Sequence, residues 1–188
     1  MRKRSFSSLF EEFPDPRSLL DLDLRRAASL HAGLLGVPMG DGDFALALER
    51  ASGVYGFCGN RDWPGLLSDL RLGLEISPEG LGLEGFMAFS VLIPDERKII
   101  LYSPSLQELF LFSHKFLKEG WDYRRFEDMA VFHEICHYVD SEVIGGFGER
   151  ERSCSEITAG VFLTRRLGTG WYARIPELLY VGRLIGAI

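Results

Sequence analysis

The chain has 188 residues, 46% of them hydrophobic, so it is long enough and apolar enough to form one packed domain. Its formal net charge of -6 argues against a nucleic-acid-binding surface, which normally needs a clear basic excess. Its three cysteines form no even disulfide framework, and no apolar run approaches the length of a membrane span. We therefore expect a cytoplasmic protein with neither nucleic acid nor a membrane as its partner.

The N-terminal part is predicted to be mainly helical. Residues 1–16 are polar and broken by prolines, so we expect an irregular arm before a single domain over 17–188. Apolar residues recur at helical spacing over Arg17–Leu35, which predicts a first helix, and a short second helix is predicted near Asp43–Ser52. The glycines and the Trp-Pro-Gly turn within Gly53–Gly65 predict a loop.

The middle of the chain has the pattern of a small sheet. Apolar residues alternate with polar ones over Leu70–Ile76, which predicts a half-buried strand. Two further β-prone runs, Gly85–Ile93 and Lys98–Tyr102, are joined by the turn-forming segment Pro94–Arg97 and predict an antiparallel hairpin. We therefore expect three strands in one sheet with antiparallel pairing.

The rest of the chain is predicted to be helical. Four helices are expected, at Ser103 to about Leu117, Tyr123–Val143, Ser153 or Ser155 to Leu167, and Ile175–Ile185. The order of helices, a short sheet and more helices predicts the α+β fold class.

The second of these helices contains polar residues where burial is expected. Its faces are largely apolar, yet His133, Glu134 and His137 lie in its middle. Buried polar side chains are unfavourable unless each has a partner, and a metal ion bound by both imidazoles supplies one. Residues four apart share a helix face, so both rings can reach one zinc ion at about 2.0 to 2.1 Å. The sequence therefore predicts a zinc site at His133 and His137.

Glu134 follows the first histidine and projects to the side of the pair. In this spacing a glutamate can meet the water on the ion without competing for the ion, which is the role of a general base. A zinc ion lowers the pKa of its water from about 15.7 towards 7, so Glu134 would accept a proton as the water attacks a carbonyl. We therefore predict a hydrolase with Glu134 as its catalytic residue.

A catalytic zinc site needs a third protein ligand, and Glu156 on the following helix is our prediction for it. The 19 residues from His137 to Glu156 allow a turn and an antiparallel return. Glu149, Glu151 and Asp140 are the competing acids. Asp140 is better placed for a contact with a ligand than with the ion, because it lies only three residues after His137.

Two small residues, Ala159 and Gly160, lie one turn beyond Glu156. We expect them to let the two helices approach closely enough for the carboxylate to reach the ion. The alternative for Glu156 is an acid stabilised in the first turn by the helix dipole, and both roles are compatible.

The motif also carries a resemblance. The segment Ala130–Val139 resembles the zincin signature, and Glu156–Phe162 resembles the gluzincin branch, most narrowly the ImmA/IrrE-type family of small intracellular metallopeptidases. The resemblance implies a zincin-like domain with an active-site helix, a glutamate-bearing helix and cleavage of repressor-like regulatory proteins. Ser155 and Gly160 depart from the thermolysin pattern, in which Asn precedes the glutamate and Asp follows it at these two places.

The predicted partner is a protein or peptide substrate, whose strand could pair with an edge of the hairpin. Tyr172, Tyr138 and Arg150 are candidates for stabilising the oxyanion, and none is preferred. Two other functions stay open: a non-catalytic binding or regulatory module that keeps the ion, and a structural metal site with four protein ligands.

Overall fold

A computed structural model describes residues 15–36, 39–83, 86–117, 121–145 and 152–184 of the chain. Within these residues the protein is α+β, as predicted, with seven α-helices and a small three-stranded mixed sheet. The predicted arm over 1–16 lies almost wholly outside the described residues. In the described ranges, no helix combines the length and the apolar character that crossing a bilayer requires.

The helix predicted over Arg17–Leu35 is two helices in the structure. These are the 3₁₀ helix η1 (Pro16–Asp21) and the α-helix α2 (Leu24–Leu34). Asp23 between them has an extended backbone, and its side chain accepts a hydrogen bond from the backbone N–H of Arg26 at 2.9 Å. This cap starts a new helix, so the prediction of one continuous helix is wrong.

The loop predicted over Gly53–Gly65 is mostly helical. α3 (Asp41–Cys58) runs into it from one side, and α4 (Trp63–Leu70) begins within it on the other. A Cβ atom on Gly53 would lie 3.2 Å from Cδ1 of Ile144, so the missing side chain lets α3 pack closely against a distant part of the chain. Here glycine reflects close packing inside a helix, and the loop prediction is wrong.

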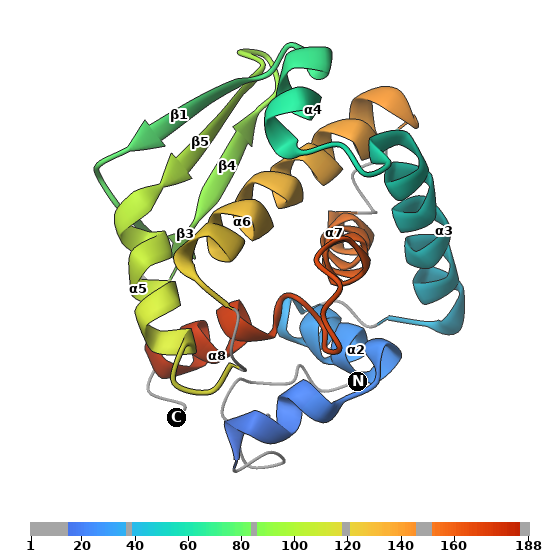
Figure 1. Cartoon of the computed structure of the whole chain (residues 1–188). Helices are drawn as coiled ribbons and strands as arrows, with labels where there is room; N and C mark the ends of the chain where they lie inside the picture. Colours follow the sequence, from blue (N-terminus) through green and yellow to red (C-terminus); the bar gives the residue numbers. More distant parts are fainter. Residues whose placement is uncertain (1–14, 37–38, 84–85, 118–120, 146–151, 185–188) are drawn as a thin grey trace.

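The described residues contain five strands in two sheets. β1 (Gly73–Ser77), β4 (Ser90–Ile93) and β5 (Lys98–Tyr102) form one, and β2 (Leu81–Leu83) and β3 (Phe86–Ala88) form the other. β5 is central in the larger sheet, where it pairs parallel with β1 and antiparallel with β4. The predicted hairpin across Pro94–Arg97 is therefore confirmed for Ser90–Ile93, whereas Phe86–Ala88 of the predicted strand Gly85–Ile93 belongs to the smaller sheet. β1 and β4 are the two edges of this sheet (Figure 1).

The first predicted strand, over Leu70–Ile76, differs from the structure in its start and its burial. Leu70 ends α4, and Arg71 caps that helix in the left-handed conformation with φ of 54°, so β1 begins only at Gly73. Ile76 is 60% exposed, so the strand is not half-buried along its length as the alternation predicts. The alternating run Leu70–Ile76 includes the end of α4 as well as most of β1. Side chains alternate between two faces in a strand but not in a helix, so the pattern was not evidence for a strand over its first residues.

The four predicted C-terminal helices are confirmed, with different ends: α5 (Ser103–Ser113), α6 (Tyr123–Tyr138), α7 (Arg152–Arg166) and α8 (Ile175–Leu184). α6 begins after Asp122, whose side chain accepts from the backbone N–H of Arg125. It continues into a π-helical turn, η2 (Val139–Val143), in which the N–H of Ile144 donates to the carbonyl of Val139 at 3.0 Å.

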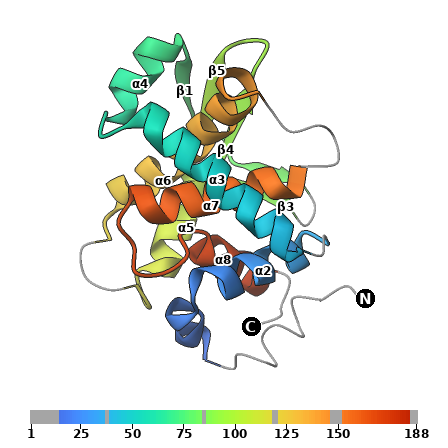
Figure 2. The ribbon, with the colours of Figure 1, turned by 90° about the vertical axis from the view of Figure 1, so that its right-hand side faces the viewer.

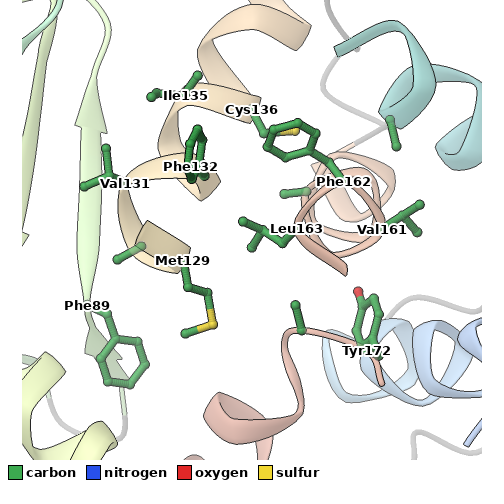
Figure 3. Packing of buried hydrophobic residues seen from close by; sticks show 14 of the residues in the cluster. Phe89, Met129, Val131, Phe132, Ile135, Cys136, Val161, Phe162, Leu163 and Tyr172 are labelled. Carbon is green, nitrogen blue, oxygen red and sulfur yellow. The ribbon is translucent and has the colours of Figure 1, made fainter. Parts of the chain in front are cut away.

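The core forms on both sides of α6. The larger sheet lies on one side and α7 on the other, with α3 alongside α7 and α2 nearby (Figures 1 and 2). Val131 points from α6 toward the sheet, whereas Phe132 packs edge to face with Phe162 of α7, the ring centroids 6.4 Å apart (Figure 3). α6 is therefore buried on nearly every face, as its apolar composition predicts.

Candidate metal centre

His133 and His137 lie on one face of α6, one turn apart, as the spacing predicts. Their Nε2 atoms are 2.9 Å apart, and the ring planes are nearly perpendicular at 87°. Both side chains are largely buried, with exposed fractions of 9% and 19%. The helix thus presents two imidazole nitrogens to a single point.

Glu156 of α7 supplies the third donor. Its carboxylate oxygens lie 3.6 Å from Nε2 of His133 and 3.3 Å from Nε2 of His137. Donor atoms at 2.0 to 2.1 Å from a tetrahedral zinc ion are about 3.3 Å apart, so these separations fit such a centre. The three donor atoms all lie within 4.8 Å of one another, and this group could hold a metal ion. Glu156 is 32% exposed, which leaves one side of the group open to solvent.

Of the three competing acids, the structure describes only Asp140, and it is not at this centre. Asp140 is buried and accepts a hydrogen bond from Nε of Arg50 at 2.7 Å. The expectation that Asp140 contacts a metal ligand is therefore wrong, because α3 carries an arginine that neutralises it. Glu149 and Glu151 lie outside the described residues.

Glu134 is buried beside the three donors and faces β4. The hydroxyl of Ser90 on that strand donates to Oε1 of Glu134 at 2.7 Å. Burial raises the pKa of Glu134, and the charge of His137 and the hydrogen bond from Ser90 oppose that shift. A carboxyl group with a raised pKa next to a metal centre suits the accepting and returning of a proton.

The imidazole of His137 is held from behind by Ser155. Nδ1 of the ring lies 2.8 Å from the Ser155 hydroxyl. The sequence predicts that this helix begins at Ser153 or Ser155, but α7 begins at Arg152, so Ser155 lies in the first turn and faces α6. This contact fixes the ring so that Nε2 points at the centre.

The charges at the centre shift the pKa values of its members in opposite directions. Burial, with the charge of Arg174, lowers the pKa of His133. Burial also lowers the pKa of His137, but the carboxylate of Glu156 outweighs it and the net shift is upward. Burial raises the pKa of Glu156, and the two histidines outweigh it, so that this carboxyl is ionised with a pKa well below its usual range.

Sequence reasoning missed Arg174 and Glu177, which adjoin the centre. Nη1 of Arg174 lies 3.1 Å from Nδ1 of His133 and 2.9 Å from Oε2 of Glu177. Nη2 of Arg174 lies 3.4 Å from Oε2 of Glu156. The only sequence signal was an Arg-Glu pair three residues apart at the start of a helix, which is common on exposed surfaces.

Gly160 does not allow a close approach between α6 and α7, contrary to prediction. A Cβ atom there would lie 2.1 Å from the hydroxyl oxygen of Tyr172, so the space over this glycine is filled by the segment between α7 and α8. Figure 3 shows the Tyr172 ring beside α7 with its hydroxyl turned toward that helix. The hydroxyl also lies 2.9 Å from Nδ1 of His31, which is buried on α2.

Of the three candidates for oxyanion stabilisation, the two that the structure describes, Tyr172 and Tyr138, are both buried. Tyr172 is fully buried and hydrogen-bonded to His31, so it cannot reach a substrate. Tyr138 is also buried, and Arg150 lies outside the described residues. The structure thus assigns Tyr172 to packing.

A hollow of about 450 Å³ lies on a different face of α6. Phe132, the neighbour of His133 in the sequence, lines this hollow, but none of the three donor residues does. Its walls come from α4, the start of α6 and the end of α7. The donor geometry, and not this hollow, therefore locates the candidate chemistry.

We predict that Ser155→Ala weakens zinc binding without removing it. The contact behind a ligating imidazole typically contributes about 10- to 100-fold to metal affinity, because it fixes the orientation of the ring. The dissociation constant, measured by competition with a chromophoric chelator, should rise by a factor in this range. Ser155→Thr keeps a hydroxyl and should retain most of the parent affinity. An unchanged affinity in Ser155→Ala would show that the ring needs no such support.

No family model, curated protein or solved structure matches the chain in sequence or fold. What can be inferred about the centre therefore comes from the residues and their geometry.

Proposed function

We propose that the chain is a zinc-dependent metallopeptidase with Glu134 as its general base. The observation that carries this proposal is the buried Glu134 carboxylate, which adjoins the His-His-Glu donor group without belonging to it. A structural metal site has no use for a second, separately held carboxylate. Burying a carboxylate is energetically unfavourable, so its presence here points to a function that offsets this cost.

The donor set supports zinc. Two imidazole nitrogens and one carboxylate suit zinc, whereas calcium and magnesium prefer oxygen donors alone. Three protein ligands are typical of a catalytic zinc site, which keeps a further position for water or substrate. When bound, zinc polarises the substrate carbonyl and makes its water acidic enough to be deprotonated near neutral pH.

The chain's own residues then divide the work. Glu134 accepts the proton of the attacking water and returns it to the departing amine. Ser90 holds Oε1 of Glu134, which leaves the other carboxylate oxygen for that proton. Ser155 holds the ring of His137 in its orientation. It is therefore a positioning residue and takes no part in the proton transfer.

The outer edge of β4 supports a polypeptide substrate. In the described part of the chain, β4 pairs with β5 on one side and with no strand on the other. An extended peptide can add to such an edge through backbone hydrogen bonds. Ser90 belongs to β4 and touches Glu134, so a peptide on this edge would pass next to the base. Together with the motif, this favours a zincin-like enzyme of the ImmA/IrrE type acting on an intracellular regulatory protein.

The metal content of the purified protein tests this proposal first. Elemental analysis after purification without added zinc should find about one zinc ion per chain, as expected for a catalytic site with three protein ligands. His137→Ala and Glu156→Ala should each lose it, because two ligands do not hold zinc against washing. Asp140→Asn is the matched control, since it removes a buried acid that does not contact the donors.

Either of two results would contradict the assignment. A parent protein without metal, even after incubation with zinc, would exclude the centre. Zinc retained at full occupancy in Glu156→Ala would show that another acid is the third ligand.

A further inference from the structure

The guanidinium of Arg174 contacts two of the three proposed metal ligands. It lies 3.1 Å from the ring nitrogen of His133 that faces away from the centre and 3.4 Å from the Glu156 carboxylate. Ligating histidines normally have an acceptor, such as a carboxylate or a carbonyl, at that nitrogen. Arginine offers only donors and is always charged. The contact therefore has the opposite polarity to the usual one.

We propose that Arg174 and Glu177 set the affinity of the centre for zinc in opposite directions: Arg174 weakens binding, and Glu177 restores part of it. This inference rests on the metal centre proposed above. Arg174 repels a divalent cation and competes for the Glu156 carboxylate, which the ion also needs. Both effects are strong because the side chains are buried and poorly screened.

Glu177 holds Arg174 and offsets its charge. Both carboxylate oxygens of Glu177 are near Nη1 of Arg174, at 2.9 and 3.1 Å, and the glutamate is buried. Removing the negative charge of Glu177 would leave the full positive charge of Arg174 next to the ligands. The loss of Glu177 should therefore weaken zinc binding, whereas the loss of Arg174 should strengthen it.

The hydrogen bonding of Arg174 argues against a purely structural role. Its Nε is buried and, among the described residues, has no hydrogen-bond acceptor. Most buried polar atoms in folded proteins have a hydrogen-bond partner, and a purely structural arginine would be expected to donate from all three guanidinium nitrogens. Arg174 instead directs its other two nitrogens at the ligands and at Glu177.

Zinc affinity in four variants tests the proposal without any substrate. Competition with a chromophoric chelator should show that Arg174→Gln binds zinc about tenfold more tightly than the parent and that Glu177→Gln binds it about tenfold more weakly. Changes to groups that contact metal ligands typically alter metal affinity by a factor of about this size. The double variant should lie near the parent, because both charges are absent. Arg174→Lys keeps the positive charge and should show no tightening.

Arg50→Gln is the matched control, because it also opens a buried ion pair but contacts none of the donors in the described structure. Its zinc affinity should equal that of the parent. Thermal unfolding of each zinc-free variant shows whether the fold is intact.

Two outcomes would overturn the inference. Zinc binding that weakens in both Arg174→Gln and Glu177→Gln would show that the pair merely supports the ligands, and equal affinity in all variants would show that its charge has no effect. Failure of the parent to bind zinc would refute the metal centre itself, so the two failures are distinguishable.

Discussion

Replacing Glu134 with glutamine is expected to reduce the rate of hydrolysis strongly while zinc stays bound. General acid–base catalysis by a positioned side chain contributes about 10²- to 10⁴-fold, so peptide cleavage should fall by a factor in this range. Cleavage can be measured on a mixture of natural peptides, so that no single substrate has to be chosen. Mass spectrometry then counts the new termini that the zinc-loaded protein produces.

The fold should tolerate this change well. Glutamine has nearly the volume of glutamate, and its amide oxygen can still accept the hydrogen bond from Ser90. Burial raises the pKa of Glu134, which means that the site disfavours a charge there. The variant should therefore unfold at the same temperature as the parent or at a higher one.

Two results would contradict the assignment of Glu134. Loss of zinc in Glu134→Gln would make this residue a ligand, and undiminished cleavage would exclude it as the base. If the protein is instead a non-catalytic module that keeps the ion, the parent should cleave no peptide, and Glu134→Gln should leave the cellular function unchanged.

Gly160→Ala is expected to destabilise the fold strongly. The added methyl group would lie 2.1 Å from the hydroxyl oxygen of Tyr172 and 2.4 Å from the ring carbon that bears it. Tyr172 is fully buried and bonded to His31, so it cannot move aside. Overpacking of this kind costs about 3 kcal/mol, at the upper end of its usual range, and thermal or urea unfolding measures it.

Gly56→Ala on α3 is the matched control, because nothing apart from the adjoining helix backbone and chain neighbours lies within 4 Å of the position that its Cβ would take. It should stabilise the protein by about 0.5 to 1 kcal/mol, since glycine is a poor helix former. Combining Gly160→Ala with Tyr172→Ala should cost less than the sum of the two single changes. Strict additivity, or a Gly160→Ala variant as stable as the parent, would show that Tyr172 does not fill this space.

The candidate centre was predictable because its residues obey local rules. His133 and His137 share a face through helical periodicity alone, and Glu156 followed from the number of ligands that zinc needs. The hairpin next to Ser90 was likewise readable from two β-prone runs around a turn.

What could not be predicted depends on contacts between distant segments. Gly53 lies within a helix where Ile144 packs against it, and Tyr172 occupies the space that a side chain at position 160 would need. Arg174 reaches the centre from the segment beyond α7, a placement that no spacing rule specifies. In each case the partner lies far along the chain or is positioned by a turn whose path the sequence does not disclose.

The two edges of the larger sheet, β1 and β4, differ in what pairing with another chain would affect. The β4 edge lies next to the candidate centre, whereas β1 forms the opposite edge and carries Ile76 with 60% of its surface exposed. An exposed edge strand with an apolar side chain can pair with another copy of itself. Pairing of a second chain along β1 would therefore leave the β4 edge next to the candidate metal centre free.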